Sequence, residues 1–146
     1  MSQFRQIDSH FLASPQITLD DVAAAQALGV KLIVNNRPEG ESDDQTPGSA
    51  IEAAAHAAGI AYVAIPVTHA GFSMPQVEAM QKALAQAGEA PVLGYCRSGT
   101  RSTLLWALAQ AANGANPFEI AAKAASGGYD ISPIRAQVDI LSARAN

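Results

Sequence analysis

A short apolar run that ends in the chain's single cysteine, and passes directly into a helix, constrains this fold more than any other feature. Residues 92–95 are predicted as a buried strand, residues 96–101 as a compact loop and residues 102–112 as a helix. A tight loop between a strand and a helix N-terminus gathers backbone N–H groups that bind an anion. We therefore expect an α/β fold with an anion-binding loop that begins at Cys96.

The rest of the chain alternates between strand and helix patterns. Strands are predicted at 4–7, 10–13, 30–35, 60–65 and 92–95, and helices at 19–28, 50–58, 73–87 and 102–112, with two short helices opened by Asn116 and Ser132. This order predicts a mostly parallel central sheet with helices on both faces and a hairpin at one edge. No linker or repeat divides the chain, so residues 1–146 are expected to form a single domain.

Ligands of such sheets bind beyond the carboxyl ends of the strands. Three predicted loops should meet there: residues 36–41, 66–71 and 96–101. Arg37 and His69 are therefore the candidate helper residues from the first two loops. Each has a purely structural alternative. Arg37 would pair with Glu39 or Glu41 and brace its loop, and His69 would be a solvated loop histidine.

Composition excludes several classes of function. The net charge of −4 argues against a nucleic-acid or membrane partner. One cysteine allows no internal disulfide or cysteine-rich metal site, and the chain has no Gly-x-Gly-x-x-Gly or Walker pattern, so we expect no metal or cofactor. The start of the chain has no apolar signal segment, which predicts a cytoplasmic protein.

The loop itself carries the expected chemistry. Two guanidinium groups, Arg97 and Arg101, lie close to Cys96 in sequence, and such surroundings favour a thiolate, which is a strong nucleophile. The alternative is that Cys96 is a buried, inert core residue. We take Cys96 and Arg101 as the catalytic candidates, and as anion-binding candidates Arg97, Ser98, Gly99, Thr100, Ser102, Arg37 and His69. Ser102 would either hydrogen-bond the cysteine or cap the helix that follows.

Several motifs resemble known families. Cys96-Arg97-Ser98-Gly99-Thr100-Arg101-Ser102 resembles both the Cys-x5-Arg loop of tyrosine and dual-specificity phosphatases, from which it is one residue shorter, and the loop of rhodanese-type sulfurtransferases. Over nearly the whole chain, the closest resemblance is to a bacterial family of small phosphatase-like domains that are also found fused to beta-lactamase-like hydrolases. The segments 35–41, 65–67 and 95–102 carry it. The resemblance implies a tyrosine-phosphatase-like fold of the dual-specificity type.

Two departures from the phosphatases bear on the reaction. The loop after Ile65-Pro66, which holds an aspartic acid in those enzymes, contains no carboxylate before Glu78, and the short Cys-x4-Arg loop should form a smaller cradle. Loss of a general acid costs on the order of 10²–10⁴ in rate. We therefore expect a sulfurtransferase that forms a persulfide on Cys96 from a thiosulfate- or persulfide-type donor and passes sulfur to an external thiol.

Two alternatives remain. One is a phosphatase that hydrolyses a phosphoester through a phosphocysteine. The other is a non-catalytic anion-binding module that senses phosphate, sulfate or a phosphorylated partner. The acids between Glu39 and Asp44 are interpreted as a solvated loop.

Overall fold

A five-stranded sheet forms the centre of the structure, a computed structural model that describes residues 3–146. The spatial order is β1 (Arg5–Gln6), β2 (Phe11–Ser14), β5 (Val92–Tyr95), β3 (Leu32–Asn35) and β4 (Ala61–Ala64). β1 runs antiparallel to β2, and the other neighbours are parallel. The predicted mostly parallel sheet is confirmed, together with the edge hairpin and the central position of residues 92–95.

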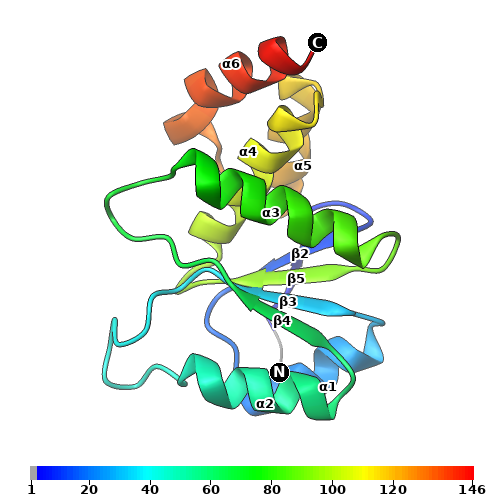
Figure 1. The fold of residues 1–146 in the computed structure, drawn as a ribbon, viewed down its shortest axis with the longest axis vertical. Coiled ribbons are helices and arrows are strands. Elements are labelled where there is room, and N and C mark those ends of the chain that lie inside the picture. The colour runs from blue at the N-terminus through cyan, green and yellow to red at the C-terminus, as the bar shows by residue number, and fades with distance from the viewer. Residues whose placement is uncertain (1–2) are drawn as a thin grey trace.

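Helices lie on both sides of this sheet (Figure 1). One side carries α1 (Leu19–Ala27) and α2 (Gly48–Ala57). The other side carries α3 (Met74–Ala87), α4 (Thr100–Ala112), α5 (Pro117–Ser126), the 3₁₀ turn η1 (Ser132–Ile134) and α6 (Arg135–Ala145). On this second side α4 is central, because α3, α5 and α6 all pack against it. The predicted three-layer arrangement is therefore present.

Capping residues set several helix starts, as their spacing in the sequence predicts. Thr18 and Asp21 form a reciprocal capping box at α1, and Ser73 and Gln76 form another at α3. The Asn116 side chain accepts the first free N–H groups of α5. These contacts are local in sequence, so the pattern alone predicts them.

Helix α4 begins at Thr100, which is earlier than the predicted start at Ser102. Its N-cap is Gly99, whose φ of 91° lies in the left-handed region that glycine adopts without strain. The Gly99 carbonyl accepts bonds from both the backbone N–H and the side chain of Thr103, at 3.0 and 2.9 Å. Arg101 therefore lies in the first turn of the helix, so its position is set by helical geometry.

Two apolar clusters fill the space between sheet and helices. The larger one lies on the α3–α6 side, and the smaller one lies under α1 and α2. Gly94 of β5 lets α4 approach the sheet, since a Cβ at this position would meet the Phe11 ring at 2.8 Å and Ser102 Cβ at 3.3 Å. Close packing of α4 on β5 fixes the loop that joins them.

The carboxyl ends of the parallel strands are tied together at one edge of the sheet. The Asn36 backbone N–H donates to the Tyr95 carbonyl at 2.8 Å, and its side chain donates to the Ile65 carbonyl at 2.9 Å. The predicted convergence of the three loops is confirmed. A fourth loop, after β2, joins them through the Gln16 N–H, which donates to the Arg97 carbonyl at 3.3 Å.

Candidate functional site

Cys96 follows directly on the central strand and has no exposed surface. Its Sγ accepts the backbone N–H of Gly99 at 3.1 Å, at the N-terminus of α4. The sulfur thus lies at the end of the helix that presents unpaired N–H groups and the positive end of its dipole. Cys96 is buried, as the core-residue alternative expects, but its sulfur accepts a backbone N–H of the loop and lies beside Arg101. Because the sulfur has no exposed surface, a substrate could reach it only after the neighbouring protein atoms move.

The Arg101 side chain is held by the loops after β3 and β4. Its Nη1 and Nη2 donate to the two carboxylate oxygens of Glu41 at 2.7 and 2.9 Å, and Nη1 also donates to the Val67 carbonyl at 2.7 Å. A guanidinium carries five N–H bonds in a fixed plane. Three of them are therefore engaged by the protein.

The remaining two N–H bonds, on Nε and on the adjacent side of Nη2, form a second fork. Two parallel donors of this kind match a pair of oxygens on a phosphoryl or sulfonyl group. The attraction between Arg101 and the Cys96 sulfur contributes to the raised pKa of Arg101, after the larger effect of the Glu41 bonds. The Arg101 guanidinium therefore lies beside the nucleophile candidate.

Glu41 joins two arginines. It pairs with Arg101 at 2.7 Å and with Arg37 Nε at 2.9 Å. The hydrogen bonds from Arg101 are the largest cause, and with those from Arg37 they lower the pKa of Glu41 from 4.5 to about 2. Glu41 is therefore a carboxylate at neutral pH and has no proton to give to a leaving group.

Arg37 is buried, and its side chain donates to residues of its own loop and of the loop after β2. Besides Glu41 it donates to Gln16 Oε1 at 3.0 Å and to Ser42 Oγ at 3.1 Å. The brace alternative is therefore the observed one, with Glu41 as the partner. Since Glu41 also holds Arg101, the brace extends into the site. The prediction that the acids of this loop are solvated is wrong for Glu41; Glu39 is exposed, as predicted, and also accepts the Gly48 N–H at 2.8 Å.

Ser102 is completely buried in the first turn of α4, and within residues 3–146 its hydroxyl has no hydrogen-bond partner. It does not cap α4, because Gly99 does. The predicted bond to the cysteine is likewise not among its contacts. The Ser102 hydroxyl is therefore a buried donor without a partner among the described residues.

The outer side of the loop faces solvent. Arg97, Ser98 and Thr100 are exposed, while Gly99 is buried beneath them. The Ser98 hydroxyl donates to Thr100 Oγ1 at 3.0 Å and also accepts the Thr100 N–H at 3.3 Å, so that amide is not directed at the sulfur. Of the anion-binding candidates, Gly99 is the one whose N–H reaches Sγ.

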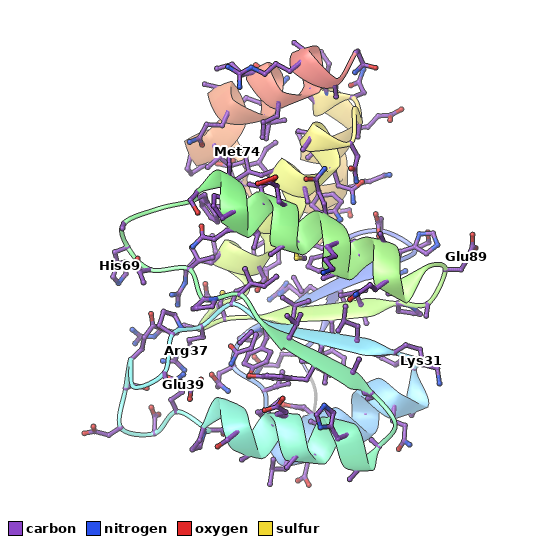
Figure 2. All side chains as sticks on the ribbon, in the orientation of Figure 1. Lys31, Arg37, Glu39, His69, Met74 and Glu89 are labelled. Atoms are coloured by element: carbon purple, nitrogen blue, oxygen red, sulfur yellow. The ribbon has the colours of Figure 1, made fainter. Side chains whose placement is uncertain are left out.

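His69 is exposed on the loop between β4 and α3. Figure 2 places His69, Arg37 and Glu39 at the same end of the sheet, and Lys31 and Glu89 at the opposite end. The loop is fastened to the site through the Val67 carbonyl, which accepts from Arg101. His69 therefore lies at the same end of the sheet as Arg37, two residues after Val67, whose carbonyl accepts from Arg101.

Sequence reasoning missed four contributors to this site: Glu41 as a partner of Arg101, Gln16, the Val67 carbonyl, and Tyr129, whose hydroxyl donates to the Ser98 carbonyl at 3.1 Å. Each contact joins positions that are distant in sequence. The acidic residues after β3 were a usable signal for Glu41, since Arg101 requires a counter-charge. Nothing in the sequence pattern marks Tyr129.

The structure combines a parallel sheet, a cysteine at the end of its central strand, an arginine in the first turn of the following helix and an acidic partner for that arginine. This combination defines a class of protein. The fold is that of the protein-tyrosine-phosphatase-like proteins, shared for example with Tk-PTP (TM-score 0.74, 14% identity, 97% of each chain). TpbA from P. aeruginosa, solved with phosphotyrosine, also shares the fold (TM-score 0.66, 19% identity, 97% of this chain and 89% of that one).

Within that class the chain belongs to the family of the phosphatase-like domain of beta-lactamase hydrolase-like proteins, whose model matches residues 3–113. The beta-lactamase hydrolase-like protein of Xylella fastidiosa is 35% identical over 108 residues, which is 74% of this chain and 25% of that protein. The chain thus spans about a quarter of the length of these curated relatives. A phosphatase candidate from Neisseria meningitidis is 34% identical over 94% of this chain and 96% of its own, with a TM-score of 0.79.

These comparisons confirm the expected family and fold. They also favour the phosphatase alternative over sulfur transfer, which the sequence had placed first, and none of them specifically supports a sulfurtransferase. Among the described residues, no cluster of three or more acidic, histidine or cysteine side chains is arranged to hold a metal. No helix within residues 3–146 combines the length and hydrophobicity needed to cross a bilayer.

Proposed function

We propose that this protein is a cysteine-dependent phosphatase that hydrolyses phosphomonoesters through a phosphocysteine on Cys96. The observation that carries the proposal is the Arg101 guanidinium beside the Cys96 sulfur, with Glu41 and Val67 occupying three of its five N–H bonds, so that the Nε–Nη2 donor pair is left for a ligand. A tetrahedral dianion fits a donor pair of this kind, and the neighbouring helix N-terminus favours its charge.

In the first step the Cys96 thiolate attacks phosphorus, the sulfur–phosphorus bond forms and the ester P–O bond breaks. The Arg101 fork, the Gly99 N–H and the Ser102 hydroxyl hold the phosphoryl oxygens, so charge is stabilised where it accumulates. Water then attacks the phosphocysteine, which releases inorganic phosphate and restores the thiolate. Arg97, Ser98 and Thr100 form the rim that the rest of the substrate meets.

The leaving oxygen requires a proton, and Glu41 cannot supply it because its pKa is about 2. The loop from Val67 to Ser73 contains one ordinary titratable side chain, His69, and the Val67–Arg101 bond anchors that loop at the site. We assign His69 the role of proton donor. Esters with good leaving groups depend little on this donor, so aryl phosphates are the favoured substrates.

Steady-state hydrolysis of 4-nitrophenyl phosphate tests the proposal. Wild type is expected to turn over, Cys96→Ser to lose at least about 10³-fold, and Arg101→Lys, which keeps the charge but loses the fork, to lose about 10²-fold in kcat/KM. Ser142→Ala, distant from the loop, is the matched control and should match wild type. No turnover by wild type, or retained turnover in Cys96→Ser, would contradict the proposal.

A second candidate function is supported by the missing carboxylate in the loop after β4. Sulfur transfer from thiosulfate needs no general acid: the thiolate attacks the outer sulfur, sulfite leaves with its electron pair, and Cys96 becomes a persulfide. An external thiol would then remove that sulfur. Incubation with thiosulfate followed by intact-mass analysis should add one sulfur atom to wild type but not to Cys96→Ser if this reaction operates.

A further inference from the structure

Tyr129 lies in the segment between α5 and η1, outside residues 3–113 that the family model matches. Its ring is half-buried and packs against the larger apolar cluster. Its hydroxyl donates to the Ser98 carbonyl at 3.1 Å. A residue from the C-terminal third of the chain thus contacts the backbone of the cysteine loop.

The contacted carbonyl belongs to the same peptide group as the Gly99 N–H. A trans peptide group is planar, and its C=O and N–H point in opposite directions. The N–H of this group donates to Cys96 Sγ at 3.1 Å. A bond that holds the Ser98 carbonyl therefore also holds the Gly99 N–H toward the sulfur.

This peptide group needs a restraint because Gly99 follows it. Glycine reaches positive and negative φ at similar cost, so the group can rotate with little backbone penalty. Gly99 has a φ of 91°, and a Cβ there would overlap Tyr129 Oη. The fit of hydroxyl and glycine is therefore close, and no larger residue could take the place of Gly99.

The Tyr129 hydroxyl also retains the proton it donates. Burial raises the pKa of Tyr129, and the nearby Cys96 sulfur acts in the same direction, although Arg5 opposes them. A neutral phenol is the form that can donate to a carbonyl. The restraint is thus present throughout the pH range in which the enzyme would work.

We propose that Tyr129 is a positioning residue: through the Ser98 carbonyl it holds the Gly99 N–H on the Cys96 sulfur and thereby stabilises the thiolate. The kinetic consequence rests on the proposed phosphatase function, whereas the effect on the sulfur does not.

The test compares Tyr129→Phe with wild type in the pH dependence of Cys96 alkylation by iodoacetamide. Phenylalanine keeps the ring and removes only the hydroxyl. The midpoint of the profile is expected to move up by about half a pH unit, with about a threefold slower reaction below the midpoint, because the thiolate loses part of one charge-assisted hydrogen bond. The kcat/KM for 4-nitrophenyl phosphate at pH 6 should fall by a similar factor.

Ser142→Ala is the matched control. Its hydroxyl also donates to a distant carbonyl, that of Ala115, at 2.8 Å, but lies away from the loop. It should lower the melting temperature and leave the alkylation profile unchanged, so a shift in Tyr129→Phe cannot be a general effect of stability. Superimposable profiles for Tyr129→Phe and wild type would overturn the proposal. A shifted profile in a protein that hydrolyses no phosphoester would support it and refute the phosphatase assignment instead.

Discussion

Glu41 is the residue on which the geometry of the site depends most. Its two carboxylate oxygens hold the end of the Arg101 guanidinium, and one of them also pairs with the buried Arg37. Without this carboxylate, Arg101 would keep its charge but lose the two bonds that hold its guanidinium in place. Arg37 would lose its charged partner as well.

We expect Glu41→Gln to lower kcat/KM for 4-nitrophenyl phosphate by about 10- to 100-fold, because an isosteric amide has one acceptor oxygen and its NH2 group cannot accept the remaining arginine N–H. Glu89→Gln, at the opposite end of the sheet (Figure 2), is the matched control and should retain full activity. Equal activity in Glu41→Gln and Glu89→Gln would show that Arg101 is oriented without Glu41.

The lowered pKa of Glu41 also predicts a pH dependence of stability. The carboxylate is favoured in the folded state, so its contribution is complete above about pH 4.5 and is lost as the pH falls toward the folded-state value of about 2. Urea denaturation at a series of pH values should show wild type more stable than Glu41→Gln at pH 7, with the difference shrinking below pH 4.5. A difference that stays constant down to pH 3 would contradict the ion-pair account.

His69 is expected to matter in proportion to the basicity of the leaving group. His69→Ala should lower the hydrolysis of phenyl phosphate by about 10- to 100-fold and that of 4-nitrophenyl phosphate less than about threefold, because nitrophenolate leaves without a proton. His56→Ala, an exposed histidine of α2, should change neither rate. Equal losses on both substrates would exclude a role in proton donation.

At the scale of elements, the position of the site depends on how the strand ends are tied together. Asn36 links β3 to the ends of β4 and β5 through the Ile65 and Tyr95 carbonyls, and its side chain is completely buried. The loops that carry Glu41 and Val67 both begin at this junction. The relative placement of these two partners of Arg101 therefore depends on the Asn36 side chain together with the backbone bond from the Val67 N–H to the Asn36 carbonyl at 3.0 Å.

Asn36→Ala should lower the free energy of unfolding by about 1–3 kcal/mol, since the buried Ile65 carbonyl loses its donor, and should also reduce kcat/KM. Asn113→Ala provides the control, because Asn113 accepts from Gln81 in an exposed contact between α3 and α4. Chemical denaturation and aryl phosphate kinetics measure both effects. Asn36→Ala with normal kcat/KM would show that the loops hold their places independently of Asn36.

These elements also show what the sequence could predict. The starts of three helices can be predicted from their N-cap residues, Thr18, Ser73 and Asn116, because each cap and its partners lie within three residues in the sequence. The start of α4 was misplaced because its cap is a left-handed glycine inside a loop-like sequence. Contacts such as Arg101–Glu41 and Tyr129–Ser98 arise from chain segments that the fold brings together, so local patterns do not reveal them.

At the scale of the whole molecule, the helices on both sides pack against the same five-stranded sheet. Trp106 of α4 is buried and stacks on Phe11 of β2 with ring centroids 5.9 Å apart, in the cluster that α3, α5 and α6 complete. A chain of this length buries enough apolar surface to fold as one unit. The expectation of a single domain over residues 1–146 leads to a direct prediction.

Unfolding in urea, followed by Trp106 fluorescence and by far-ultraviolet circular dichroism, should give one transition with coincident midpoints. The fluorescence reports the α4 side of the sheet, because the chain has a single tryptophan, whereas dichroism reports the helices of both sides. Two separated midpoints would show that the α1–α2 layer and the α3–α6 layer unfold independently.

In the proposed reaction, Cys96 attacks phosphorus while Arg101 holds the phosphoryl group. The most direct measurement is intact-mass analysis of protein quenched in acid within milliseconds of mixing with 4-nitrophenyl phosphate, followed by peptide mapping. The account predicts a transient adduct with the mass of a phosphoryl group on the peptide that contains Cys96, and no adduct in Cys96→Ser. Turnover of substrate with no adduct on Cys96 at any time point, or with the phosphoryl group on another residue, would contradict it.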